Sequence, residues 1–141
     1  MRVSDVMTTE AITLEANASI QEAAALMKKF NIGAVLCTQN NKLTGIITDR
    51  DIILRLVAEN IPCAESKCKD FMTQSPVTIT PDADIHFAGS MMAEYQIRRL
   101  PVVQDNKLLG ICTLGDLAVE ATSEAESVLE KVSRPIRKEV A

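Results

Sequence analysis

The chain has 141 residues, enough for one compact domain or for two small halves that share a core. Hydrophobic residues make up 47% of it but aromatic residues only 3%, so the core must consist mainly of Ile, Val, Leu, Ala and Met. A net charge of −4 and a pI near 5.0 argue against direct nucleic-acid binding, which needs a basic face. Because no apolar run approaches the roughly 18 residues of a membrane span and no signal peptide is recognisable, we expect a cytoplasmic protein without membrane contacts.

The sequence contains an internal duplication. Sliding the chain on itself by 65 residues aligns Asp5 with Asp70 and keeps the register without a gap as far as Ile53 and Ala118. Identical pairs recur along the whole alignment, among them Met7/Met72, Thr13/Thr78, Ile20/Ile85, Met27/Met92, Ile32/Ile97, Gly45/Gly110, Thr48/Thr113 and Asp51/Asp116. Chance does not keep such a register. We therefore expect one repeat with its connector at 1–64, a second at 65–121, and a tail at 122–141.

Each repeat predicts the same first elements. A short strand rich in β-branched residues, at 11–14 and again at 76–79, is followed by an amphipathic helix. The helix begins at Asn17 or Ser19 in the first repeat and at Asp82 or Asp84 in the second. Its apolar stripe, at spacings of three and four, comprises Ile20, Ala23, Ala24, Met27 and Phe30, and in the second copy Ile85, Ala88, Gly89, Met92 and Tyr95.

The second part of each repeat predicts a β-hairpin and another helix. Two apolar runs, 32–37 and 43–48, flank turn-forming residues, and 100–103 and 108–113 repeat this arrangement. The following helices are expected at 49–59 and from about 114 to 121. The repeat unit is thus β-α-β-β-α, and the fold class is α/β. For the tail, 122–141, we expect a helical or flexible terminus that either frays or docks on a partner.

The four cysteines fall into two kinds. Cys37 and Cys112 lie in apolar runs, where a cysteine is usually a small buried hydrophobic residue. Cys63 and Cys68 lie in a polar connector. They are either surface thiols without a function or a metal or redox pair with His86 as a third ligand.

A heptapeptide closes each hairpin, Gly45 to Asp51 in the first repeat and Gly110 to Asp116 in the second. Both copies have Gly, two hydrophobic residues, Thr, two variable residues and Asp. In this pattern the chain resembles the CBS-domain family over roughly residues 1–121. The resemblance implies two CBS repeats packed with pseudo-two-fold symmetry around two clefts, each able to hold AMP, ADP, ATP or S-adenosylmethionine. It also implies a homodimer.

The heptapeptide has the chemistry of a ribose-phosphate site. Asp51 and Asp116 fall in the first turn of the second helix, where a carboxylate can accept hydrogen bonds from both ribose hydroxyls. Thr48 and Thr113 add a hydroxyl at the strand end, and the helix N-terminus favours phosphate. The alternative is that Thr and Asp do no more than cap the helix.

By the resemblance, the adenine pocket of each cleft comes from the other repeat. The cleft at Asp116 should use the segment around Ile12 and the side chain of Ile32. The cleft at Asp51 should use the segment around Val77 and the side chain of Ile97. Ordinary core positions are the alternative for these aliphatic residues.

The two repeats differ in cations. Arg98 and Arg99 open the first hairpin strand of the second repeat, where the first repeat has Gly33 and Ala34. In the family such residues reach the ligand's phosphates, and the alternative is a salt bridge to Asp105 or Glu94. Arg50 is the cation of the Asp51 cleft. We expect the Asp116 cleft to prefer a phosphorylated ligand, and the Asp51 cleft to be weaker or to suit a less charged adenosyl compound.

No enzyme motif is present: no Walker or Rossmann glycine loop and no pair of histidines at metal-binding spacing. We expect a regulatory module without catalysis and without an obligatory cofactor. It would sense an adenine nucleotide or S-adenosylmethionine and modulate an unknown partner protein. The alternatives are a ligand-free scaffold module, or a redox or metal sensor that uses Cys63 and Cys68.

Overall fold

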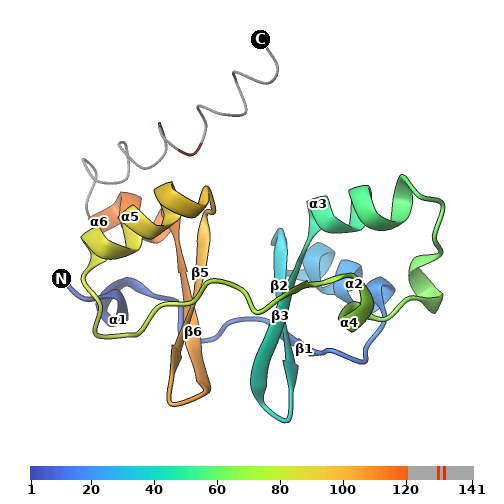
Figure 1. Ribbon diagram of the computed structural model, residues 1–141, viewed down its shortest axis with the longest axis horizontal. Helices are drawn as coiled ribbons and strands as arrows, with labels where there is room; N and C mark the ends of the chain where they lie inside the picture. The colour runs from blue at the N-terminus through green and yellow to red at the C-terminus, as the bar shows by residue number, and fades with distance from the viewer. Residues whose placement is uncertain (121–129, 131, 133–141) are drawn as a thin grey trace. The chain divides into compact units, whose positions relative to one another are not determined.

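The computed structural model describes residues 1–120, Glu130 and Val132, so the prediction for the tail, 122–141, lies almost wholly outside the described residues. The chain forms two compact units (Figure 1). The continuous unit is Ala11–Pro76, and the split unit is Met1–Glu10 together with Val77–Ala141. These limits differ from those of the sequence repeats, because the first ten or so residues of each repeat pack with the elements of the other repeat.

The continuous unit holds a mixed four-stranded sheet. Its elements are β1 (Thr13–Glu15), α2 (Ile20–Phe30), β2 (Ala34–Gln39), β3 (Lys42–Thr48), α3 (Asp49–Ile52), the π-helix η1 (Ile53–Val57), the 3-10 helix η2 (Cys63–Glu65), α4 (Cys68–Phe71) and β4 (Thr73–Gln74). The strand order is β1-β2-β3-β4. β1 and β2 are parallel because helix α2 carries the chain back between them, whereas the hairpin β2–β3 and the pair β3–β4 are antiparallel.

The split unit repeats this plan with less regular strands at its edges. Its elements are α1 (Val3–Val6), α5 (Ile85–Tyr95), β5 (Arg99–Gln104), β6 (Lys107–Thr113) and α6 (Leu114–Glu120). β5 and β6 form an antiparallel hairpin. Single bridges, Thr8 to Ile111 and Ile79 to Val102, stand where the continuous unit has β4 and β1. The strand expected at 76–79 is therefore reduced to the bridge at Ile79.

The α/β fold and the duplication are confirmed in detail. Helices α2 and α5 begin and end at residues that differ by 65, and so do the corresponding hairpin strands of the two units. Both hairpin turns have two residues with positive φ, Asn40 with Asn41 and Asp105 with Asn106, as a type I′ turn requires. Of the predicted helix caps, Ser19 accepts a hydrogen bond from the Glu22 amide and Asp84 from the His86 amide.

Two expectations for the helices need correction. Phe30 and Tyr95, predicted in the apolar stripe, are the last residues of their helices and are 45% and 53% exposed. The helix expected over 49–59 is α-helical only to Ile52 and continues as a π-helix to Val57.

Each unit has its own hydrophobic core, built from equivalent positions. Ile20, Ala23 and Met27 are buried in the continuous unit, and their counterparts Ile85, Ala88 and Met92 in the split unit. Both hairpins show the same alternation of buried and exposed residues. In the part of the chain that the structure describes, no helix is long and apolar enough to cross a membrane.

Candidate functional site

The Thr and Asp of each heptapeptide form a reciprocal cap at the start of the second helix. In the continuous unit Thr48 Oγ1 accepts from the Asp51 amide at 3.1 Å, and Asp51 Oδ2 accepts from the Thr48 amide at 3.0 Å. The corresponding distances for Thr113 and Asp116 are 3.2 and 2.8 Å. The capping role is thus confirmed in both copies. It occupies only one oxygen of each carboxylate.

The second carboxylate oxygen distinguishes the two copies. Asp51 Oδ1 lies 3.4 Å from the Arg55 guanidinium, in an ion pair across one helical turn. Asp116 Oδ1 has no hydrogen-bond or ion-pair partner among the described residues, although Asp116 is half-buried. Asp116 therefore keeps more acceptor capacity for a ligand. Arg55 was missed in the sequence, where its four-residue spacing from Asp51 was the available signal.

The structure brings Arg98 and Arg99 to the second motif. Arg99 stands directly opposite Thr113 in the hairpin register, so the two side chains leave the same face of the sheet. The Leu114 amide, at the start of α6, donates to the Arg98 carbonyl at 2.9 Å. Arg98 is exposed and Arg99 half-buried. Within the described residues neither arginine forms the alternative salt bridge to Asp105 or Glu94.

The first motif has a different neighbourhood. Ala34 stands opposite Thr48 in the hairpin, and the Gly33 carbonyl accepts from the Asp49 amide at 3.0 Å. The backbone geometry of the two sites is thus the same, and only the second has cationic side chains at the strand. Arg50, in the first turn of α3, is exposed.

The residues expected to supply the adenine pockets lie in the unit opposite to the motif they would serve. Ile12 and Ile32 belong to the continuous unit, and Val77 and Ile97 to the split unit. All four are half-buried. Their meeting with Asp116 and Asp51 stays a prediction.

The glycine of each heptapeptide is required by a close chain crossing. A Cβ atom on Gly110 would lie 2.3 Å from the carbonyl oxygen of Thr8, in the first segment of the chain. On Gly45 it would lie 2.4 Å from Sδ of Met72 and 2.8 Å from the carbonyl oxygen of Thr73. Both contacts are too short for any side chain. The motif glycines therefore serve packing within each unit.

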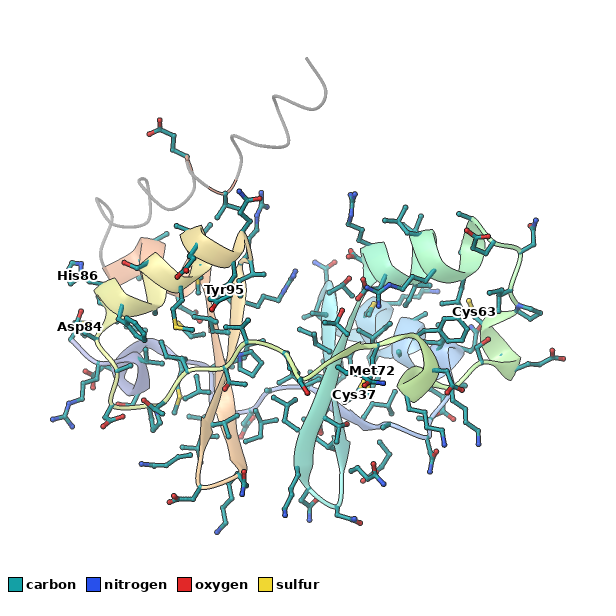
Figure 2. The ribbon with its side chains drawn as sticks, viewed as in Figure 1. Cys37, Cys63, Met72, Asp84, His86 and Tyr95 are labelled. Atoms are coloured by element: carbon teal, nitrogen blue, oxygen red, sulfur yellow. The ribbon has the colours of Figure 1, made fainter. Side chains whose placement is uncertain are left out.

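The surface-thiol interpretation is wrong for Cys68, which is fully buried in the core of the continuous unit. By the 65-residue register it occupies the position of Val3, which is buried in the split unit. A hydrogen bond between its thiol and that of Cys37 raises the pKa of Cys37, as does burial. The same hydrogen bond lowers the pKa of Cys68, against the opposing effect of burial. Cys63 is partly exposed and lies on η2, well apart from Cys37 (Figure 2).

The expected burial of Cys37 and Cys112 is confirmed. Burial, and after it the carboxylate of Asp116, raises the pKa of Cys112 to about 12. Among the described residues, no group of three or more His, Cys, Asp or Glu side chains could hold a metal ion. His86 lies beside the capping Asp84 in the first turn of α5 (Figure 2).

These environments predict selective alkylation of one thiol. Iodoacetamide at pH 8 should modify Cys63 in the folded protein and leave Cys37, Cys68 and Cys112 unmodified until urea is added, because reaction requires an accessible thiolate. Peptide mass spectrometry over a time course measures the order. The Cys63→Ser variant, which should show no early modification, is the control. Early labelling of Cys68 would contradict its burial.

The continuous unit also has an open groove of about 530 Å³. It is lined by Gln39, Leu43, Thr44, Lys69, Asp70, Met72, Gln74 and Ser75. Neither Thr48 nor Asp51 contributes to it. The groove and the Thr–Asp motif are therefore separate features of this unit.

Comparison with known proteins gives a consistent result. Residues 3–58 and 68–122 match the model of the CBS domain. The CBS domain-containing protein YhcV of Bacillus subtilis (strain 168) is 42% identical over 133 residues, which cover 93% of this chain and 94% of that protein. The CBS domain pair of protein MJ0100, solved in complex with 5′-methylthioadenosine and S-adenosyl-L-methionine, has 30% identity and a TM-score of 0.77, covering 88% of this chain and 98% of that chain. Hypoxic Response Protein I, solved with two coordinated zinc ions, has 26% identity and a TM-score of 0.78, covering 84% and 98% of the two chains.

Proposed function

Because this chain belongs to the CBS-domain family, we propose that it is a regulatory module that binds an adenosine-containing ligand and catalyses no reaction. The observation that carries the proposal is the second motif. There Asp116 keeps an unengaged carboxylate oxygen, and Arg99, without a salt bridge in the described residues, stands opposite Thr113. A carboxylate for the ribose hydroxyls and an arginine for phosphate are the groups that such a ligand needs.

The ligand class is supported by a relative. The MJ0100 pair was solved with two adenosyl compounds, and it is 30% identical to this chain over most of both chains. In this chain the Asp116 site is the one suited to a phosphorylated ligand, since its strand carries Arg98 and Arg99. The Asp51 site, with Gly33 and Ala34 at those positions, suits a less charged adenosyl compound. Ile12 and Ile32 would complete the first of these sites, and Val77 and Ile97 the second.

The regulatory output is a change in affinity for a partner protein. A ligand that binds one conformation of the module better than another shifts the population toward it, and a partner that distinguishes the two conformations responds. The proposed assembly is a homodimer. Exposed apolar side chains on η1, Ile53, Leu54 and Val57 at 50% to 58% exposure, support a protein interface there. Light scattering of the purified protein tests the homodimer, because it measures the molar mass of the assembly.

A thermal-shift panel tests the proposal. The melting temperature should rise with AMP, ATP, S-adenosylmethionine or 5′-methylthioadenosine, because a ligand that binds only the folded state stabilises it by about 2.7 kcal/mol at a hundred times its Kd. Guanosine and cytidine nucleotides at equal concentration are the controls. A rise with zinc or an oxidant alone would favour the sensor alternative through Cys63 and Cys68. No response to any of them would favour a ligand-free scaffold.

A further inference from the structure

Arg55 connects the Asp51 site to the segment through which the chain leaves the continuous unit. Its Nη2 lies 3.4 Å from Asp51 Oδ1. Its Nη1 donates to the Phe71 carbonyl at 2.6 Å, and Nη2 donates to Thr73 Oγ1 at 3.4 Å. One guanidinium thus bridges the proposed ribose carboxylate and residues 71–73.

The bridged segment, residues 71–73, leads into the edge strand of the sheet of the continuous unit. Thr73 begins β4, which pairs with β3 at Gly45 and Ile46, the place where the motif glycine permits the close crossing. The continuous unit ends three residues later, at Pro76. Loss of the Arg55 hydrogen bonds to residues 71–73 therefore affects the chain directly before it enters the split unit.

In sequence, the second repeat lacks an arginine at the position from which Arg55 makes this bridge. The 65-residue register places Glu120 where the first repeat has Arg55, and an ionised carboxylate has no N–H group to donate to Asp116. The Thr–Asp caps are otherwise the same in both copies. The difference between the two carboxylates is therefore due to a single position in the helix.

We propose that Arg55 gates the first site: it competes with the ligand's ribose for Asp51, and the ribose releases residues 71–73 when it displaces the guanidinium. This inference rests on the proposed function and adds its regulation. The Thr48 amide holds Asp51 Oδ2, as the Thr113 amide holds Asp116 Oδ2, so Oδ1 is the oxygen left for the ribose hydroxyls, and in the first site Arg55 holds it. The ion pair is weak enough to yield, because the Arg55 side chain is 44% exposed and water screens such pairs.

Binding of 5′-methylthioadenosine, measured by calorimetry, tests the competition. In an Asp116→Asn background that reports the first site, Arg55→Met should tighten binding by about two- to fivefold, the range expected for an exposed ion pair. Lys28→Met, which removes an exposed helical cation of the same unit, is the matched control and should leave the affinity unchanged.

Amide hydrogen exchange tests the tether, first in the ligand-free protein and then with ligand. Residues 71–75 should exchange faster in ligand-free Arg55→Met than in the unaltered protein or in Lys28→Met. In the unaltered protein 5′-methylthioadenosine should raise exchange in this segment, and in Arg55→Met it should not.

Each outcome separates the two proposals. Unchanged or weaker binding in Arg55→Met, with binding still present, overturns the gate and leaves the proposed function in place. Unchanged exchange at 71–75 in the free variant overturns the tether. No binding of any adenosyl compound to the unaltered protein at either site overturns the proposed function and the gate with it.

Discussion

Replacing Gly110 by alanine should lower the free energy of unfolding by about 3 kcal/mol, at the upper end of the range for overpacked positions. The added Cβ would lie 2.3 Å from the Thr8 carbonyl oxygen, and this obstacle is main chain that a rotamer change cannot remove. The Thr8 amide also donates to the Ile111 carbonyl, and the Ile111 amide to the Thr8 carbonyl, both at 2.9 Å. Moving Thr8 away from the new Cβ would break these two hydrogen bonds. Urea unfolding followed by circular dichroism measures the loss.

Two further glycines provide the controls for this experiment. Gly45→Ala should cost less, about 1 to 2 kcal/mol, because the Met72 side chain can move and the remaining main-chain obstacle, the Thr73 carbonyl oxygen at 2.8 Å, is farther away than the Thr8 oxygen is from Gly110. Gly115→Ala should be neutral or stabilising by up to about 1 kcal/mol, since its Cβ would meet only Thr113 Oγ1, at 3.6 Å, and alanine favours helix. Equal stability of Gly110→Ala and Gly115→Ala would show that the first segment does not cross the hairpin at this point.

Asp116→Asn should weaken binding of every adenosyl ligand at the second site by about 10- to 100-fold. The change removes the charge and one of the two acceptor oxygens, so the loss corresponds to about one hydrogen bond to a charged acceptor, about 1.5 to 3 kcal/mol. An asparagine amide keeps an oxygen for the Thr113 amide, so the helix cap and the fold should persist. Calorimetry with ATP and with 5′-methylthioadenosine measures the loss.

The control for this variant is Asp84→Asn, a second capping aspartate in the same unit replaced in the same way. It should leave the affinity unchanged. Arg99→Ala, on the strand opposite Thr113, should lower the affinity for ATP and leave that for 5′-methylthioadenosine nearly unaltered, because only the former has phosphates. Unaltered binding of both ligands in Asp116→Asn would remove this carboxylate from the proposed site.

The regular part of the fold could be predicted because local signals repeat. The turn residues Asn40 and Asn41 and the caps Ser19 and Asp84 act on their immediate neighbours, and the second copy shows the same signals again. Short elements could not be predicted. α1, α4 and β4 have four residues or fewer, too few to show a periodicity, and they are held by distant parts of the chain: the Val3 amide by the Ala83 carbonyl, the Cys68 amide by the Ala18 carbonyl and Thr73 by pairing with Ile46.

The candidate site shows the same limit. Thr48, Asp51, Thr113 and Asp116 stand out because the spacing recurs, and the hairpin register then brings Arg99 beside the second pair. Arg55 did not stand out, because its role depends on Phe71 and Thr73, which reach it only through the folded connector. Cys68 was misjudged for a similar reason. Its neighbours Lys67 and Lys69 are polar, whereas its own side chain faces the core.

The split unit imposes an order on synthesis and folding. Residues 1–10 leave the ribosome long before their partners, the Ala83 carbonyl for the Val3 amide and Ile111 for Thr8, are translated. Residues 11–76 have all their partners once Pro76 has emerged, so the continuous unit can fold while the split unit is still being made. The first ten residues must wait, unpaired, until the second hairpin is complete. A ribosome that stalls within that hairpin would therefore carry one finished unit and one exposed N-terminal segment.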